Sequence, residues 1–343
     1  MSSGQTSPGT AASAEFPRTA RLSVSLPYWQ DRDPLETMAV ADAADKLGFD
    51  QLWIGEMATF DAFALATAIG SRTRDIDLCV GPLAVDIRTP ATIAIGVASV
   101  AALTGRRVDV AIGASSTVVV GDWHGRERRR TAAHLEDTAR ILRGLLDGGK
   151  VDYLGVVERT RGYRLRLPAP GSSITIAAFG ARALDCAARV ADRVVLNLVT
   201  PEQVARCAQI VRGVAERAGR PCPRIAVWVT AAADPTVELL ATLRRGIVGY
   251  LAAPGYADMF SEAGYSEVVA LARSGAHPRE VLAAVPDALA ATIGMFGDEA
   301  TVKSRLAEYR SAGADEIVAV PATATDDPAG IRTLEMLARL GHE

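Results

Sequence analysis

From Thr19 onward, short apolar runs alternate with longer amphipathic stretches. Most of the runs are followed by a stretch whose apolar residues recur at helical spacing. The runs are nearly continuous and lack the alternation of apolar and polar residues that marks a half-exposed strand. Strands covered on both faces have this pattern, so it predicts a parallel sheet with helices outside it. Eight runs are strand candidates: residues 21–27, 51–56, 76–83, 108–115, 173–179, 193–199, 224–230 and 316–321.

Eight strand–helix units in about 325 residues favour an α/β protein built as a closed (β/α)8 TIM barrel. An open, doubly wound sheet is the alternative, although no GxGxxG follows the first strand. The helix after the third strand has Thr89 at its predicted N-cap and Pro90 at its first helical position.

Two segments exceed the minimal barrel and predict insertions after strands four and seven. Residues 151–171 are typical of a β-hairpin before the fifth strand. Residues 252–297, punctuated by Gly, Pro, Tyr and Phe, predict a helical lid. Chemistry in such barrels lies at the carboxyl ends of the strands, where a lid would shape the substrate pocket. Asn197 and Trp228 are expected to point toward this face, with core packing favoured for Trp228.

Composition narrows the classes of function. The net charge of −3 argues against a broad basic surface for nucleic acid. The four cysteines have no CxxC spacing and the four histidines are scattered, so we expect neither a disulfide framework nor a metal site. No apolar run approaches the roughly 20 residues of a membrane helix. We expect a cytoplasmic protein that acts on a small molecule, with residues 1–17 a disordered leader and residues 18–343 a single domain.

Four stretches, taken in order, carry a family resemblance: residues 42–56, 88–116, 177–202 and 297–321. Over essentially Leu22 to Leu340, the chain resembles the bacterial-luciferase-like flavin and deazaflavin oxidoreductases. The resemblance implies a luciferase-like TIM barrel with a flavin-type cofactor. Barrels of this family commonly pair through helices near strands two and three, so it also implies a homodimer. The Ala-rich helix after the third strand is compatible with such pairing, and packing only on its own sheet is the alternative.

The stretch SSTVVVGDWHG (residues 115–125) is similar to the segment after strand four in members that use the deazaflavin coenzyme F420. Those members commonly have Gly-Pro after the first Ser, and Glu before a Gly-Trp pair. This chain has Ser116 and Thr117 in the first place, and Val-Gly-Asp at residues 120–122 in the second. The likeness implies coenzyme F420 as the cofactor, with FMN as the alternative.

Gly180 follows the fifth strand and begins a helix. Free amides at a helix N-terminus bind phosphate through their N–H groups and the helix dipole. Because glycine lets a phosphate approach the backbone, Ala178, Gly180, Ala181 and Arg182 are the predicted phosphate-binding residues, and the resemblance strengthens this prediction. An ordinary strand–helix turn is the alternative.

The turn after the fourth strand supplies further cofactor candidates. Ser115, Ser116 and Thr117 are positioned to donate hydrogen bonds to the same phosphate, or they serve only the turn. Trp123 and His124 are predicted beside the polar tail of the cofactor, with capping or packing as the alternative. The basic run at residues 126–130 indicates a solvated helix start, and a phosphate or tail contact is its alternative.

Gly81 and Pro82 interrupt the third strand. Members of the family often have a non-prolyl cis peptide here, in a bulge that backs the ring of the cofactor. Before proline, the cis form costs only about 0.5–1 kcal/mol relative to trans. We predict a cis Gly81–Pro82 bond, with a trans proline that ends the strand as the alternative.

Glu56, after the second strand, is the best-placed carboxylate for a catalytic proton donor or acceptor, with a salt bridge as the alternative. The sugar-phosphate and alcohol dehydrogenases of the family have a His just after this strand, where this chain has Met57. The turn after strand four likewise has Ser115 or Ser116 in place of an acid. The resemblance therefore implies reduction of a C=C, C=N or C=O group more than alcohol oxidation. An FMN-dependent monooxygenase and a non-catalytic cofactor-binding protein are the alternatives.

Overall fold

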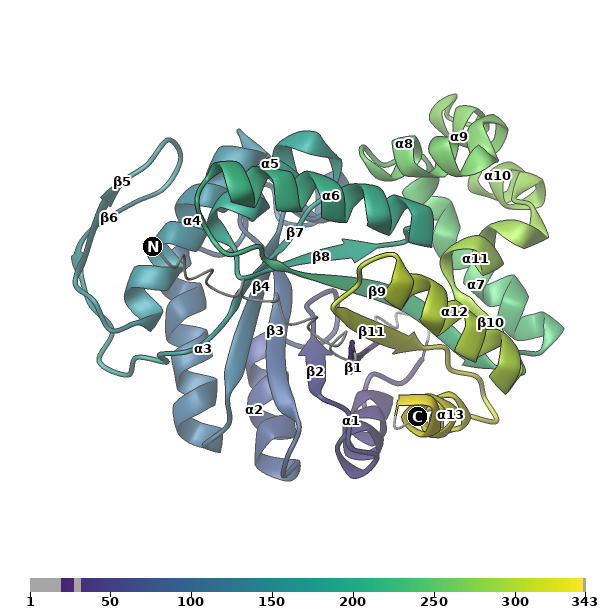
Figure 1. Cartoon of the computed structure of the whole chain (residues 1–343), viewed down its shortest axis with the longest axis horizontal. Coiled ribbons are helices and arrows are strands. Elements are labelled where there is room, and N and C mark those ends of the chain that lie inside the picture. Colours follow the sequence, from purple (N-terminus) through teal and green to yellow (C-terminus); the bar gives the residue numbers. More distant parts are fainter. Residues whose placement is uncertain (1–19, 28–31, 342–343) are drawn as a thin grey trace, which may run out of the picture.

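The computed structural model describes residues 20–27 and 32–341, in which eight parallel strands close into a barrel (Figure 1). Each strand pairs with its neighbour in the ring, and the last pairs with the first, which confirms the predicted (β/α)8 fold. In ring order the strands are β1 (Arg21–Ser25), β2 (Gln51–Ile54), β3 (Asp77–Ala84), β4 (Val108–Gly113), β7 (Ile174–Ala177), β8 (Arg193–Asn197), β9 (Arg224–Ala233) and β11 (Glu316–Pro321).

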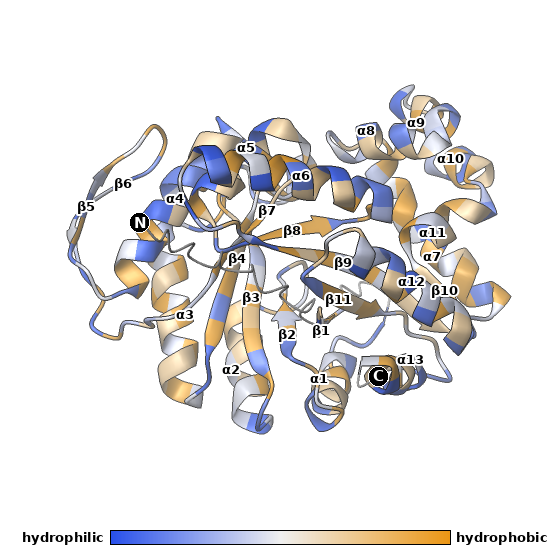
Figure 2. Cartoon of the chain, viewed as in Figure 1, coloured by the Kyte–Doolittle hydropathy of each residue, from blue (hydrophilic) through white to orange (hydrophobic). Residues whose placement is uncertain are grey.

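Helices cover the outside of the barrel, and Figure 2 shows hydrophobic residues concentrated along the strands between them. Thr89 caps the helix after β3 and Pro90 begins it, as predicted. The basic run at residues 126–130 precedes its helix and does not start it, because Arg130 has a φ of 48°. The ring comprises α1 (Glu36–Lys46), α2 (Ala62–Arg72), α3 (Pro90–Thr104), α4 (Thr131–Leu146), α5 (Gly180–Val190), α6 (Pro201–Arg217), α12 (Glu299–Ser311) and α13 (Ile331–Gly341).

A buried arginine fills the amino-terminal half of the barrel. Arg193 on β8 has no exposed surface. Its guanidinium donates to Glu316 Oε2 at 2.6 Å, to Gln51 Oε1 at 2.8 Å and to Thr175 Oγ1 at 2.9 Å. The same group lies 4.4 Å from the ring centroid of Trp53. One side chain therefore holds β8, β11, β2 and β7 together.

The predicted hairpin is confirmed as β5 (Val151–Leu154) and β6 (Arg159–Tyr163), which lie outside the barrel at the left of Figure 1. Asp137 on α4 anchors it. This buried carboxylate accepts hydrogen bonds from the Tyr153 hydroxyl at 2.9 Å and from the backbone N–H of Val157 at 2.7 Å. A Cβ on Gly155 would lie 2.3 Å from the Asp137 carboxyl group, so only glycine fits in the hairpin turn.

His134, on the first turn of α4, joins the hairpin to the loop after β3. Its Nδ1 lies 3.1 Å from Asp86 Oδ1 and its Nε2 lies 2.9 Å from Glu158 Oε1. Burial lowers the pKa of His134, but the hydrogen bonds and charges of Glu158 and Asp86 outweigh it and raise the pKa above its usual value. The ring is therefore favoured as a cation between two carboxylates.

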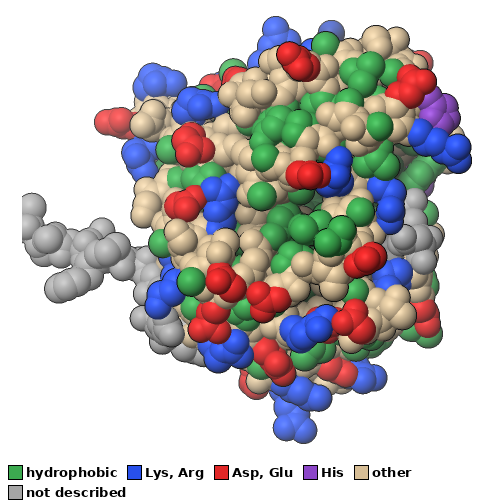
Figure 3. Space-filling view, turned by 90° about the vertical axis from the view of Figure 1, so that its right-hand side faces the viewer, with side chains coloured by type: hydrophobic (Ala, Val, Ile, Leu, Met, Phe, Trp, Pro, Cys, Tyr) green, Lys and Arg blue, Asp and Glu red, His purple; other side chains and the backbone are tan. Residues whose placement is uncertain are grey.

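The segment after β9 forms a helical lid with a hydrophobic core of its own, on the right of Figure 1. The predicted lid spans residues 252–297, but the structure begins it earlier: Ile247 and Leu251 pack into the lid core. It also ends in an unpredicted strand, β10 (Met295–Gly297), which pairs with β9 and is too short for a pattern to reveal. Figure 3 views this side, where hydrophobic side chains lie among charged ones. The lid helices are α7 (Val237–Leu251), α8 (Tyr256–Phe260), α9 (Ser266–Arg273), α10 (Pro278–Ala284) and α11 (Asp287–Ile293).

Replacing Arg193 with Met is expected to lower the free energy of unfolding by about 3–5 kcal/mol, because Glu316 would keep a buried charge without its partner. Denaturant titration measures this loss. Arg339→Met is the matched control, because Arg339 pairs with Glu299 at the surface. The control is expected to cost less than about 1 kcal/mol. Equal, small losses in the two variants would contradict a stabilising role for the buried network.

Replacing His134 with Gln is expected to remove a pH-dependent part of the stability. A group whose pKa is raised on folding stabilises fully below its unfolded-state pKa, about 6.5 for histidine, and this contribution is lost as pH rises through the folded-state pKa. The difference in melting temperature between the unsubstituted chain and His134→Gln should therefore be largest near about pH 6 and decline toward about pH 9. A difference that grows with pH would contradict a stabilising protonated His134 between Asp86 and Glu158.

Candidate functional site

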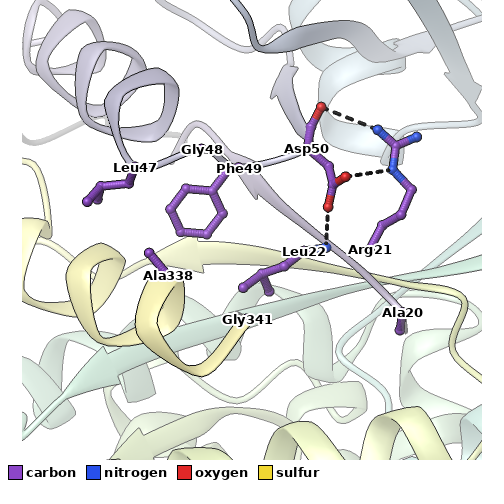
Figure 4. Close-up of a pocket in the computed structure, with 9 residues that line it drawn as sticks. All are labelled: Ala20, Arg21, Leu22, Leu47, Gly48, Phe49, Asp50, Ala338 and Gly341. Carbon is purple, nitrogen blue, oxygen red and sulfur yellow. Dashed lines mark hydrogen bonds and ion pairs between the residues drawn. The ribbon is translucent and has the colours of Figure 1, made fainter. Parts of the chain in front are cut away.

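The predicted site residues lie at the carboxyl ends of β2, β3, β4 and β7, around the barrel mouth. A hollow of about 290 Å³ lies at the opposite end, near the start of β1 and the ends of α1 and α13 (Figure 4). Its polar wall is the ion pair of Arg21 with Asp50, with Nε and Oδ1 3.4 Å apart. This hollow is remote from every predicted site residue.

Small residues form one wall of the mouth. The Gly81–Pro82 peptide bond is cis, as predicted, and the register of β3 against β4 shifts between Val80 and Leu83. Gly81 has a φ of 121°, and a Cβ there would lie 2.1 Å from the carbonyl oxygen of Ala111. A Cβ on Gly113 would lie 3.4 Å from the Cβ of Pro82. A side chain is therefore excluded at Gly81 and would be tightly packed at Gly113.

The first turn of α5 presents free backbone amides at the mouth. Buried Ala178 and then Phe179 follow β7, and Phe179 at the N-cap provides no side-chain hydrogen bond. By contrast, side chains cap α2, α3 and α6. Gly180 has a φ of 74°, with open space where a Cβ would lie, and Ala181 and Arg182 are exposed. The helix N-terminus is therefore open to an anion.

The turn after β4 leaves the barrel beside this helix, because β4 and β7 are paired. Ser115 has a φ of 56° and Thr117 is exposed. The Ser116 hydroxyl accepts a hydrogen bond from the Val119 N–H at 3.1 Å, at the start of a π-helix over Val118–Trp123. It can still donate its own hydrogen, and Ser115, Ser116 and Thr117 are all exposed.

Trp123 and His124 lie at the end of this π-helix. Trp123 is 47% exposed, and His124 follows it at the C-cap, also exposed. The structure thus brings the two predicted tail-binding residues to the surface on the same loop as Ser115.

Glu56 lies two residues beyond β2 and is held in an ion-pair cluster. Its Oε2 accepts a hydrogen bond from Arg88 Nε at 2.9 Å, and a second guanidinium contact binds Oε1. Arg88 also pairs with Asp61, the N-cap of α2. The hydrogen bond that Arg88 donates to Glu56 is the main reason that the pKa of Arg88 is raised. The salt-bridge alternative for Glu56 is therefore present in the structure, and its catalytic role stays a prediction.

Lid residues that the sequence did not single out reach the mouth. Asn197, at the end of β8, donates from Nδ2 to the Tyr256 hydroxyl at 3.1 Å. The Tyr256 ring centroid lies 4.5 Å from that of Phe179 and 4.9 Å from that of Tyr250. Burial raises the pKa of Tyr256. Residues about 60 to 80 positions apart meet here, and the only sequence signal is an aromatic lid segment after Gly255.

Trp228 packs in the barrel interior against Trp53, with ring centroids 5.6 Å apart and nearly perpendicular planes. Across residues 20–27 and 32–341, no group of three or more His, Cys, Asp and Glu side chains could hold a metal ion. In the same ranges, no helix has the length and apolar character to cross a membrane.

A family model described as luciferase-like monooxygenase matches residues 14–316 of the chain. A Mycobacterium tuberculosis protein that carries the provisional name coenzyme F420-dependent oxidoreductase is 24% identical over 339 residues, with 89% of this chain and 96% of the relative covered.

Solved structures share the fold. The F420-dependent tetrahydromethanopterin reductase of Methanopyrus kandleri has a TM-score of 0.79 at 18% identity, covering 94% of this chain and 98% of its own. An F420-dependent secondary alcohol dehydrogenase with an F420–acetone adduct has a TM-score of 0.77 at 17% identity, covering 95% and 100%. An FMN-bound type II Baeyer–Villiger monooxygenase of Pseudomonas putida has a TM-score of 0.68 at 19% identity, covering 93% and 97%.

Proposed function

The chain belongs to the luciferase-like monooxygenase family, and on that premise we propose that it is an oxidoreductase with coenzyme F420 as its cofactor. One observation carries the proposal: the uncapped N-terminus of α5 follows β7, which pairs with β4, and β4 pairs in turn with the strand that carries the bulge at Gly81 and Pro82. A cofactor with a phosphate and a flat ring would use both features at the same end of the barrel. The name of the mycobacterial relative and the likeness of residues 115–125 to F420-using members support the same cofactor.

The donor set fits this cofactor. The amides of Gly180 and Ala181 would bind the phosphate, with Arg182 adding positive charge. Ser115 and Thr117 would donate hydroxyl hydrogen bonds from the neighbouring turn. For the rest of the cofactor we propose the wall at Gly81 and Pro82, buried Ala178, exposed Ser116, and Trp123 and His124 near the polar tail.

When bound, the deazaflavin supplies a hydride for the substrate, so the protein needs chiefly to position it and to manage a proton. We propose reduction of a C=C, C=N or C=O group in a small organic substrate. Met57 stands where alcohol-oxidising members have a His, which supports this direction. Glu56 is the proposed acid–base group, and Arg88 fixes its carboxylate at the mouth.

We also propose a cytoplasmic homodimer of single-domain chains. The outer face of α3 supports pairing, because Ile95 is 46% exposed and Leu103 is 72% exposed on a helix that is apolar nearly all round. An FMN-dependent monooxygenase is the second candidate, favoured by the FMN-bound structure of the same fold. A non-catalytic cofactor-binding protein is the third.

Titration of the chain with F420 and, separately, with FMN tests the cofactor, with fluorescence as the readout. We expect F420 to bind at micromolar concentration and FMN not to bind. FMN uptake with oxygen-dependent turnover would replace the proposal by the monooxygenase. Tight F420 binding without turnover on any unsaturated or imine acceptor would favour the carrier protein.

Gly180→Val is expected to weaken F420 binding at least about tenfold, because a β-branched side chain is strained at positive φ and would crowd the phosphate. Gly219→Val is the matched control, since Gly219 also has positive φ and open space around it but follows α6 at the opposite end of the barrel. The same loss in both variants would mean that general destabilisation, and not a phosphate contact, is responsible.

Glu56→Gln keeps the size of the side chain and removes its charge. If Glu56 transfers the proton, kcat should fall by about a hundredfold, within the usual range of general acid–base catalysis. Asp61→Asn is the control, because it removes the other carboxylate of Arg88 while Asn still caps α2. An unchanged kcat in Glu56→Gln would leave Glu56 with only its structural role.

A further inference from the structure

We propose that Tyr256 is a positioning residue through which the lid holds the turn that binds the cofactor phosphate, so that lid order and cofactor binding are coupled. This inference rests on the proposed function, since it takes the first turn of α5 as the phosphate site.

The lid contacts that turn through two consecutive residues. The Tyr256 ring lies 4.5 Å from the Phe179 ring, centroid to centroid. A Cβ added to Gly255 would lie 3.3 Å from the Phe179 Cβ, so the lid backbone itself runs against this side chain. Phe179 is the N-cap of α5 and directly precedes Gly180. The lid therefore packs against the residue that sets where the first amides of α5 point.

Tyr256 is itself held from the barrel side. Its hydroxyl accepts the hydrogen bond from Asn197 on β8. One turn later, the backbone carbonyl of Met259 accepts a hydrogen bond from Gln203 Nε2 at 2.7 Å. Gln203 belongs to the capping box that begins α6, so it is part of the rigid barrel. These contacts fix α8 relative to β8 and α6. Because the Tyr256 ring packs on Phe179, the position of α8 also constrains Phe179.

Other contacts join the lid to the barrel away from this turn: Arg206 on α6 pairs with Glu262, Arg305 on α12 donates to the Thr292 carbonyl, and β10 pairs with β9. The remaining lid helices pack on the separate lid core. The hydroxyl of Tyr265, for example, lies 2.6 Å from Thr292 Oγ1, within the lid. Tyr256, together with Gly255, is where the lid contacts the α5 turn, so loosening either side is expected to loosen the other.

Coupling of this kind is reciprocal. If the lid contact stabilises the turn in the form that binds phosphate, phosphate bound to the turn must stabilise the lid contact by the same factor. The structure thus predicts one effect of the lid on cofactor affinity and an equal effect of the cofactor on lid order. Both can be measured without turnover.

The test measures F420 affinity by fluorescence for Tyr256→Ala, Tyr256→Phe and the control Tyr265→Ala. Tyr256→Ala removes the ring that packs on Phe179 and is expected to weaken F420 binding by roughly tenfold. Tyr256→Phe keeps the ring and should restore affinity to within about threefold of the unsubstituted chain. Tyr265→Ala removes the same group elsewhere in the lid and should change affinity by less than about threefold.

Hydrogen exchange supplies the second readout. F420 should slow exchange of the amides of α8 in the unsubstituted chain, and this protection should be lost in Tyr256→Ala. If Tyr256→Ala does not fold, Phe179→Ala makes the same break from the turn side and carries the same expectations.

Two results would overturn the inference and leave the proposed cofactor unaffected. One is an unchanged F420 affinity in Tyr256→Ala. The other is a rate of hydrogen exchange in α8 of the unsubstituted chain that does not change when F420 is added. Equal weakening in Tyr265→Ala would overturn it as well, because the lid as a whole would then be responsible. Failure of the unsubstituted chain to bind F420 would overturn the proposed function, and the inference with it.

Discussion

The interior of this barrel is organised around the charged guanidinium of Arg193, which has no access to water. Removing Arg193 from water is costly unless every donor finds an acceptor, and no single strand can supply them all. Its partners come from β2, β7 and β11, and Asp109 on β4 adds a second carboxylate with Oδ2 3.8 Å from Nη2. Glu316 is satisfied in turn by the Ser23 hydroxyl at 2.8 Å on β1. The network fixes the register of strands that lie far apart in the chain.

The same network determines where chemistry can occur. Above it, Trp53 and Trp228 fill the middle of the barrel edge to face. The interior of the amino-terminal half is thereby filled, and the predicted site residues lie at the carboxyl ends of the strands. There the side chains become small, with a bulge at Gly81 and Gly113 beside it. The mouth therefore lies above the buried Arg193 network, and small residues at Gly81 and Gly113 line one side of it.

Contacts outside the barrel adjust this mouth from two sides. The hairpin, held by Asp137 and by His134 between two carboxylates, braces the start of α4. The lid, held through Tyr256, braces the start of α5. Neither α4 nor α5 has a side-chain cap at its N-terminus. The two insertions of the chain therefore support the first turns of α4 and α5, and the first turn of α5 is the proposed phosphate site.

Much of the fold was open to prediction because it depends on local pattern. The continuous apolar runs specify buried parallel strands, and Thr89 and Pro90 specify the start of α3. The cis bond was predicted from the family resemblance together with the low cost of the cis form before proline. The start of α4 was harder to predict from the sequence, because Arg130 has a left-handed backbone conformation that is more typical of glycine. The limits of the lid were also missed, since the amphipathic pattern of α7 does not say which core it packs on.

For the site, the sequence by itself determined which residues end each strand, and hence the small wall, the open helix at Gly180 and the carboxylate of Glu56. Only the tertiary structure decided what those groups touch. It paired Glu56 with Arg88, used the Ser116 hydroxyl inside its own turn, and brought Tyr256 onto Phe179. The physical reason is range: strand and helix patterns follow from neighbours a few residues apart. Ion pairs and aromatic contacts depend instead on where barrel closure places segments that the chain keeps far apart.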